Sequence, residues 1–179
     1  MKKIIPIILV VILAGFKLSA QEETKQENVK PALLVIDVQN KYLPMMSQED
    51  QAYALGMMNW AIWVFRQYDF PVIRVYHTSE KWGPEPGSEE FAFHDTLKVL
   101  EEDPMIIKTY GSAFNKTELD SLLKAQSVNT LFMCGLSSVG CVLATYFDAG
   151  NYDYKAFLIR DALLGPDAAN TDKVEEMFD

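Results

Sequence analysis

Short apolar runs recur along this chain and set the strongest limit on how it can fold. The runs are continuous rather than alternating, which is typical of strands buried on both faces, as in parallel sheets. They fall at residues 32–36, 72–76, 105–107, 130–133 and 156–159. Segments with helical patterns follow at residues 49–69, 116–126, 141–149 and 170–179. This alternation predicts an α/β fold with three α/β/α layers and a mostly parallel sheet of five to six strands, in Rossmann-like order with right-handed crossovers.

Local signals place the ends of these helices. Pro71 ends the first helix. Asn115, with Glu118 three residues later, resembles a capping box for the helix over 116–126. Gly150 is expected to stop the helix that begins at Cys141. Residues 77–103 form a long irregular stretch rich in Gly and Pro, with a short helix expected within 89–100. Loops of this length in a compact domain are usually functional or disordered, so we expect the substrate-specificity loop here.

The first thirty residues differ from the rest of the chain. A lysine-rich head, an apolar run over 4–16 and the small residues Leu18-Ser19-Ala20 have the pattern of a signal peptide over residues 1–20. The alternative is a retained anchor, but the run is shorter than the roughly 20 apolar residues of a spanning helix. Residues 21–30 are polar and indicate a flexible tether. We therefore expect an exported protein, periplasmic or secreted, with one domain over 31–179.

The charge of the chain excludes one class of partner. The formal net charge is −9, and loss of the three leader lysines makes it −12. A strongly acidic surface repels phosphate backbones, so we expect no nucleic-acid partner. No basic amphipathic stretch suggests binding to a membrane surface once the leader is removed.

Three reactive residues follow three of the predicted strands. Asp37 comes after the first strand, Lys108 after the third and Cys141 shortly after the fourth. Because the carboxyl ends of parallel strands meet in one crevice, we expect these three side chains to converge. His77 ends the second strand and is expected to line the same crevice.

The three residue types suit nucleophilic catalysis. A helix N-terminus and a neighbouring lysine would both favour the thiolate of Cys141. Asp37 could accept the thiol proton. The small-residue loop over 136–140 could direct backbone N–H groups at a developing oxyanion.

Three stretches carry a family resemblance: ALLVIDVQNKY (32–42), IIKTYGSAFNKTEL (106–119) and LFMCGLSSVGCVLATYFDAGNYDYKAFLIRDA (131–162). With them the chain resembles the isochorismatase-like cysteine hydrolases, which include nicotinamidases, N-carbamoylsarcosine amidohydrolases and ureidoacrylate hydrolases. The resemblance implies a hydrolase that cleaves an amide or ureido C–N bond of a small molecule through a Cys thioester, without a cofactor.

The resemblance also implies individual roles. Asp37 would be the base, Lys108 the catalytic lysine and Cys141 the nucleophile. The backbone N–H groups of Ser137 and Cys141 would form the oxyanion hole, beside a cis peptide between Leu136 and Ser137. The aromatic side chains of Tyr42 and Phe114 would line the substrate pocket.

The chain departs from the resembled family in two places. Eighteen residues follow Asp161, so either the sheet lacks its usual last strand or the chain is truncated. Nicotinamidases bind a metal through an Asp/His cluster after the second strand, whereas this region offers His77-Thr78-Ser79-Glu80 without a second nearby histidine. We therefore do not expect the metal site of nicotinamidases in this chain.

Several alternatives stay open at this point. Cys134 and Cys141 are the only cysteines, and in an exported protein they could form a disulfide. His77 could pair with Cys141 as in papain-like enzymes. The chain could instead hydrolyse a vinyl ether, as true isochorismatases do, or be a binding protein that kept the fold.

The first helix and the turn before it suggest self-association. They carry more large apolar residues than one buried stripe holds, namely Met45, Met46, Met57, Met58, Trp60 and Trp63. We expect the excess to form a subunit interface of a homo-oligomer, as is common in the resembled family.

Overall fold

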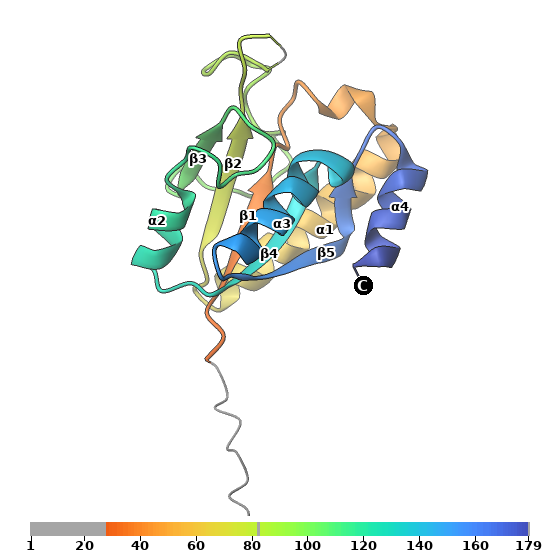
Figure 1. Cartoon of the computed structure of the whole chain (residues 1–179). Helices are drawn as coiled ribbons and strands as arrows, with labels where there is room; N and C mark the ends of the chain where they lie inside the picture. Colours follow the sequence, from red (N-terminus) through yellow and green to blue (C-terminus); the bar gives the residue numbers. More distant parts are fainter. Residues whose placement is uncertain (1–27, 82, 179) are drawn as a thin grey trace, which may run out of the picture.

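A computed structural model describes residues 28–81 and 83–178 and has a five-stranded parallel sheet at its centre (Figure 1). The strand order is β3-β2-β1-β4-β5, and every neighbouring pair is parallel. The bounds are Pro31–Ile36 (β1), Val72–His77 (β2), Met105–Lys108 (β3), Thr130–Leu136 (β4) and Lys155–Leu164 (β5). The predicted α/β class and parallel sheet are confirmed.

Helices cover both faces of this sheet, which gives the three predicted layers (Figure 1). Helix α1 packs alone on one face, and α2, α3 and α4 lie on the other. Their bounds are Gln48–Gln67 (α1), Leu119–Ala125 (α2), Leu143–Asn151 (α3) and Ala168–Met177 (α4). Two short turns complete the set, the 3-10 turn Leu43–Met45 and the π-type turn Ser138–Val142.

The buried residues of β1 explain why the site lies where it does. All six residues of this central strand are buried, because layers of helices cover both of its faces. Its neighbours β2 and β4 are largely buried as well. Side chains that are to contact a ligand can therefore come only from the residues at the carboxyl ends of these strands.

Several predicted helix ends are wrong. Helix α2 begins at Leu119 and has no side-chain cap, so Asn115 does not cap it; the Thr117 hydroxyl instead accepts a hydrogen bond from the Leu119 N–H. Gly150 lies inside α3, which ends at Asn151. Strand β5 runs to Leu164, well beyond residue 159, after a register shift opposite Met133 and Gly135.

The expected helix within 89–100 is also absent from the described residues. Aromatic packing holds this segment instead. Phe91 and Phe93 stack on Tyr76 of β2, with ring centroids 4.8 and 4.1 Å away. Gln39 pairs with Phe93 through an isolated β-bridge. These contacts hold the loop after β2 against the carboxyl end of the sheet.

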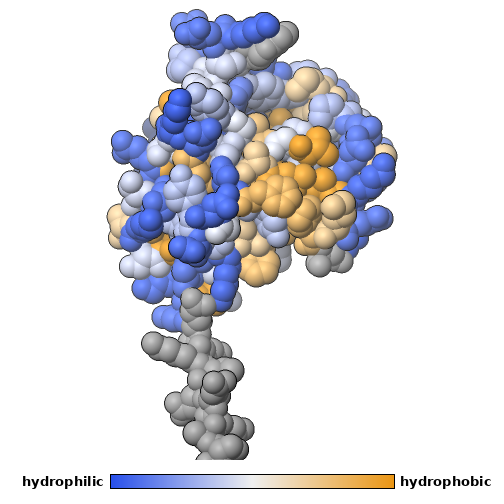
Figure 2. Space-filling model, viewed as in Figure 1, coloured by the Kyte–Doolittle hydropathy of each residue, from blue (hydrophilic) through white to orange (hydrophobic). Residues whose placement is uncertain are grey.

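Within the described residues the sheet has five strands, and β5 forms one edge of it. The predicted signal peptide and most of the tether lie outside the described residues. Among the residues that the structure describes, no helix is long and apolar enough to cross a membrane. Figure 2 shows apolar side chains gathered over α3 and toward α4, where Tyr146, Phe147 and Phe178 touch one another.

Candidate active site

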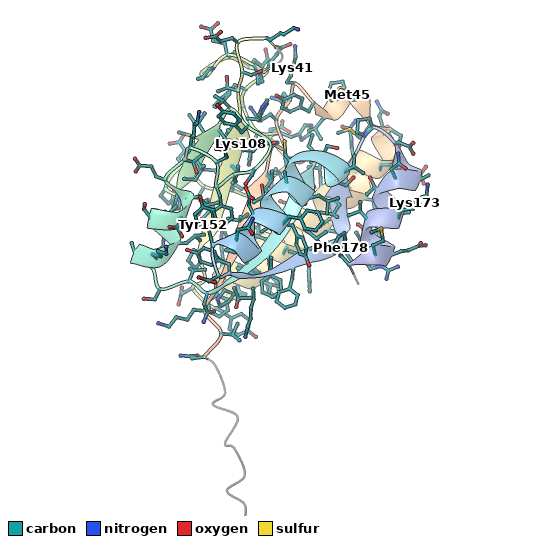
Figure 3. The ribbon with its side chains drawn as sticks, in the orientation of Figure 1. Lys41, Met45, Lys108, Tyr152, Lys173 and Phe178 are labelled. Atoms are coloured by element: carbon teal, nitrogen blue, oxygen red, sulfur yellow. The ribbon has the colours of Figure 1, made fainter. Side chains whose placement is uncertain are left out.

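A buried ion pair joins the ends of two strands that are not neighbours in the sheet. The Lys108 ammonium at the end of β3 donates to Asp37 Oδ2 at 2.7 Å. Lys108 is 1% exposed and Asp37 is 2% exposed. Figure 3 shows Lys108 at the carboxyl end of the sheet. Lys108 also donates to the Tyr110 carbonyl at 3.3 Å, so its position is fixed from two directions.

Asp37 is held by its own backbone as well. Its φ is +53°, in the left-handed region that a non-glycine residue adopts at some cost. Its N–H donates to the Val75 carbonyl of β2 at 2.8 Å. The second carboxyl oxygen, Oδ1, is buried and has no hydrogen-bond partner among the described residues. One oxygen of the carboxylate is therefore occupied by Lys108, and the other is left to accept a proton.

Cys141 lies against this pair. Its thiol interacts with both Asp37 and Lys108. Burial, together with the Asp37 charge, raises the pKa of the Cys141 thiol to about 11, although Lys108 opposes this shift. Burial likewise raises the pKa of the Asp37 carboxyl, and Lys108 opposes that shift. At neutral pH the Cys141 thiol therefore keeps its proton.

The position of Cys141 differs from the expected helix N-terminus. Cys141 lies in the π-type turn Ser138–Val142, and α3 begins two residues later, at Leu143. Gly140 within the turn has non-helical angles (φ −120°, ψ −107°). The desolvation of the thiol outweighs the effect of Lys108 on its pKa. A thiolate at Cys141 would therefore have to form by loss of the thiol proton to a neighbouring group.

The loop before Cys141 contains the residues for which the resemblance implies an oxyanion hole. The peptide bond between Leu136 and Ser137 is cis, as the resemblance implies. Within the part of the chain that the structure describes, the Ser137 N–H donates to no protein acceptor. The Ser137 carbonyl accepts from the N–H groups of Gly140 and Val142, which turns the chain tightly around Cys141.

Two contacts and a glycine that the sequence reasoning missed shape this loop. Gly135 has a φ of +117°, and a Cβ there would overlap the backbone of Ile36, the residue before Asp37. The Ser138 hydroxyl hydrogen-bonds Thr171 of α4 at 2.8 Å, and both residues are buried. A glycine at 165 leaves room for that bond, because its Cβ would approach both hydroxyls within 3 Å.

A buried threonine connects Cys141 to the loop after β3. The Thr145 hydroxyl donates to the Cys141 carbonyl at 2.7 Å and accepts from the Ala113 N–H at 3.0 Å. The only signal in the sequence is the spacing of four residues between Cys141 and Thr145, which places both on one side of a helical turn.

Tyr42 and His77 form a second polar pair at the same end of the sheet. The Tyr42 hydroxyl lies 2.8 Å from His77 Nδ1. Burial and the charges of Asp37 and Cys141 raise the pKa of Tyr42, so the phenol keeps its proton. Burial, with the charge of Lys108, lowers the pKa of His77 to about 4. The hydrogen bond therefore joins a protonated phenol to a neutral imidazole.

Gln39, a buried residue that the sequence reasoning overlooked, holds His77 in place. Its amide donates to the His77 carbonyl at 3.1 Å, and its oxygen accepts from the His77 N–H at 2.8 Å. The only sign of this role in the sequence is a glutamine shortly after an apolar strand. Besides burial, the groups that shift the pKa of Cys141 are Asp37 and Lys108, which does not favour a papain-like Cys–His pair.

Phe114 is placed differently from expectation. It is 3% exposed and stacks on Tyr152 and Tyr154, with ring centroids 4.8 and 5.7 Å away. The expectation that its ring lines the substrate pocket is not supported, because it packs in the core beneath α3.

Both cysteines are free thiols, so the alternative of a disulfide is wrong in this structure. Cys134 is fully buried within β4. Among residues 28–81 and 83–178, no group of three or more His, Cys, Asp or Glu is arranged to hold a metal ion.

The model of the isochorismatase domain family matches residues 31–178. A curated relative, the uncharacterized isochorismatase family protein YrdC of Bacillus subtilis, is 30% identical over 136 residues, which cover 74% of this chain and 73% of the relative. A probable inactive nicotinamidase of Arabidopsis thaliana is 32% identical, with 69% of this chain and 74% of the relative covered. The ureidoacrylate amidohydrolase RutB of Agrobacterium fabrum is 32% identical over 97 residues, covering 51% of this chain and 42% of RutB.

Solved structures show the same fold. An isochorismatase family protein has a TM-score of 0.74 at 27% identity, and the match covers 84% of this chain and 93% of that protein's chain. N-carbamoylsarcosine amidase from Thermoplasma acidophilum has a TM-score of 0.72 at 25% identity, with 84% of this chain and 93% of the amidase covered.

Proposed function

The chain belongs to the isochorismatase family, and from this premise we propose that it hydrolyses an amide or ureido C–N bond of a small molecule through a thioester on Cys141. The observation that carries the proposal is the buried Asp37 carboxylate, with Oδ2 held by Lys108 and Oδ1 without a partner among the described residues. A general base needs a free acceptor oxygen in a fixed position beside the nucleophile. Relatives named as ureidoacrylate and maleamate amidohydrolases support the bond type.

The first half of the proposed reaction forms the thioester. Asp37 takes the thiol proton as the Cys141 sulfur attacks the carbonyl carbon, which avoids a free thiolate in a buried site. The N–H groups of Ser137 and Cys141 stabilise the resulting oxyanion. When the intermediate collapses, the C–N bond breaks and the departing amine takes the proton from Asp37.

The second half returns the site to its starting state. Water attacks the thioester carbon while Asp37 accepts one of its protons. Collapse then breaks the C–S bond, and the proton on Asp37 returns to the Cys141 sulfur. The products are the carboxylic or carbamic acid and the amine. Lys108 stays against Asp37 throughout and favours its anionic form between proton transfers.

The test is hydrolysis of a panel of simple amides and ureido acids by wild type, Cys141→Ala and Cys134→Ala. We expect activity to be lost in Cys141→Ala and kept in Cys134→Ala, which removes the other, buried thiol. Mass spectrometry should detect an acyl adduct on Cys141 at short times. Equal turnover by wild type and Cys141→Ala would contradict the thioester proposal.

The same variants and substrates, together with isochorismate, distinguish this proposal from two alternatives, a vinyl-ether hydrolase and a binding protein. A vinyl-ether hydrolase would release pyruvate from isochorismate and depend on Asp37 far more than on Cys141. A binding protein would hydrolyse none of the compounds in the panel. This outcome has to be tested, because one relative is described as a probable inactive nicotinamidase.

We also propose that the protein is exported and that its leader is removed after Ala20. The support is the pattern of residues 1–20 in the sequence. The N-terminal sequence of the protein from a cell envelope or culture medium fraction tests this proposal. A chain that still starts at Met1 would contradict it.

A further inference from the structure

The loop that carries the Ser137 N–H is attached to the last helix of the described chain. Ser138, the next residue, is fully buried, and its hydroxyl lies 2.8 Å from the hydroxyl of Thr171 in α4. Among the described residues, this is the only hydrogen bond of the Ser138 side chain. A buried hydroxyl without a partner is costly, so the position of Thr171 determines where Ser138 lies.

Thr171 is itself held by the first turn of α4. Asp167 caps this helix, because its side chain accepts a hydrogen bond from the Asn170 N–H. The Asp167 carbonyl accepts from the Thr171 N–H at 3.2 Å, and the Thr171 hydroxyl lies 3.4 Å from the same carbonyl. The hydroxyl of Thr171 can therefore donate to Asp167 while it accepts from Ser138.

Two features further along α4 attach the helix to the rest of the fold. The Glu175 carboxylate accepts from the Asp161 N–H of β5 at 2.9 Å. Val174 is buried and belongs to the same hydrophobic cluster as Val142, the residue after Cys141. Figure 1 shows α4 beside β5. Helix α4 is thus a fixed support for the loop.

The sheet fixes the other end of the loop. Leu136, the last residue of β4, pairs with Leu164 of β5. Gly165 follows Leu164, and a Cβ there would lie within 3 Å of both bonded hydroxyls, so only a glycine lets them meet. The Ser137 N–H therefore lies between two fixed points, Leu136 in the sheet and Ser138 on α4.

These two attachments decide where the Ser137 N–H points. A donor in an oxyanion hole is effective only when it is directed at the position where negative charge develops. Within the part of the chain that the structure describes, the Ser137 N–H has no acceptor that could set its direction. Its direction depends instead on the residues on either side of it.

We propose that Thr171 is a positioning residue, which acts through Ser138 to direct the Ser137 N–H at the oxyanion of the acyl-transfer steps. This inference rests on the proposed function, because it assigns a role within that reaction. Thr171 does not have to touch the substrate. It also has no part in the proton transfer from Cys141 to Asp37.

The test removes the hydrogen bond from either side. Thr171→Val keeps the shape of the side chain without its hydroxyl, whereas Thr171→Ser keeps the hydroxyl. Ser138→Ala removes the bond and leaves no buried group unpaired, because the Thr171 hydroxyl can still donate to the Asp167 carbonyl. Thr130→Val is the matched control: Thr130 is 2% exposed, and its hydroxyl bonds the Asn129 side chain at the amino end of β4.

Amide hydrolysis, Tm and the alkylation of Cys141 by iodoacetamide would be measured on the purified full chain. We expect kcat to fall at least ~10-fold in Thr171→Val and Ser138→Ala with KM changed less than about twofold, because the lost interaction belongs to the transition state. Thr171→Ser should keep most of the activity. Thr130→Val should lower Tm about as much as Thr171→Val but keep kcat. Alkylation forms no oxyanion, so its rate should be the same in every variant.

A small aldehyde gives a second readout that requires no turnover. When propanal adds to Cys141, a C–S bond forms, the carbonyl double bond becomes single, and the thiol proton passes to the carbonyl oxygen. That oxygen then lies where the oxyanion would form. Protection of Cys141 from iodoacetamide measures the affinity for propanal. We expect this affinity to be at least ~10-fold weaker in Thr171→Val and Ser138→Ala than in wild type and Thr130→Val.

The two readouts separate this inference from the proposed function. A wild type that binds propanal but hydrolyses no amide would contradict the proposed function, and the comparison of propanal affinities would still decide the role of Thr171. Equal affinity for propanal in wild type and Thr171→Val would overturn the inference. A wild type that does not bind propanal, or equal losses of kcat in Thr171→Val and Thr130→Val, would overturn it as well.

Discussion

Asp37 and Lys108 form a buried ion pair, 2.7 Å long, although β2 lies between the strands that carry them. The long lysine side chain crosses the end of β2 to reach the carboxylate. Removal of one partner of a buried pair leaves an uncompensated charge and typically costs ~3–5 kcal/mol. Loss of either partner alone would therefore destabilise the fold and also change the protonation state of the site.

Replacement of Lys108 tests the role of this pair in catalysis. Lys108 lowers the pKa of Asp37 against the effect of burial, so Lys108→Met should raise that pKa. Because Asp37 must be ionised to act as a base, the acidic limb of the pH–rate profile should move to higher pH. We expect turnover to fall at least ~100-fold, a typical contribution of a positioned base. Lys108→Arg keeps the charge without the shape and should lose less. An unchanged profile for Lys108→Met would make Lys108 a bystander.

Replacement of Asp37 should separate thiol reactivity from catalysis. The charge of Asp37 raises the pKa of Cys141, so Asp37→Asn should lower it. Alkylation of Cys141 by iodoacetamide at mildly alkaline pH should then become faster than in wild type, while amide hydrolysis is lost. Cys134 is fully buried and should stay unlabelled. Peptide mapping then identifies Cys141 as the labelled site. Slower alkylation of Asp37→Asn would contradict the proposed electrostatic arrangement.

The convergence of Asp37, Lys108 and Cys141 could be predicted from the sequence because it follows from topology alone. Each residue comes after an apolar run, and the carboxyl ends of parallel strands meet. The resting state of Cys141 could not be predicted in this way, since its pKa depends on how deeply the folded chain buries the thiol. Gln39, Thr145 and Thr171 were missed for a related reason: each acts through tertiary hydrogen bonds, which leave no periodic signal in the sequence.

His77 should affect how stability varies with pH. Its pKa is about 4 in the folded chain, below the ordinary value of 6.5, because the buried imidazole resists protonation. The unfolded chain takes up this proton first as the pH falls. The contribution of neutral His77 is therefore fully present above pH 6.5 and is lost as the pH falls from 6.5 toward 4. We expect His77→Gln to show a smaller drop in Tm than wild type when the pH is lowered from about 7 to about 5. Equal drops would mean that His77 does not contribute.

Two glycines should respond to alanine in opposite directions. Gly135 has a φ of +117°, and a Cβ there would lie 2.8 Å from the Ile36 nitrogen. Backbone strain of this kind costs of order 1–3 kcal/mol, and relief of the overlap would displace the residue before Asp37. Gly135→Ala should therefore lower both the free energy of unfolding and the turnover. Gly150 lies exposed in α3, and a methyl group added there would meet no atom within 4 Å, so Gly150→Ala should raise the free energy of unfolding by about 0.5–1 kcal/mol. Urea unfolding and amide hydrolysis, measured on both variants, check these outcomes. A Gly135→Ala protein as stable and active as wild type would show that the contact with Ile36 does not position Asp37.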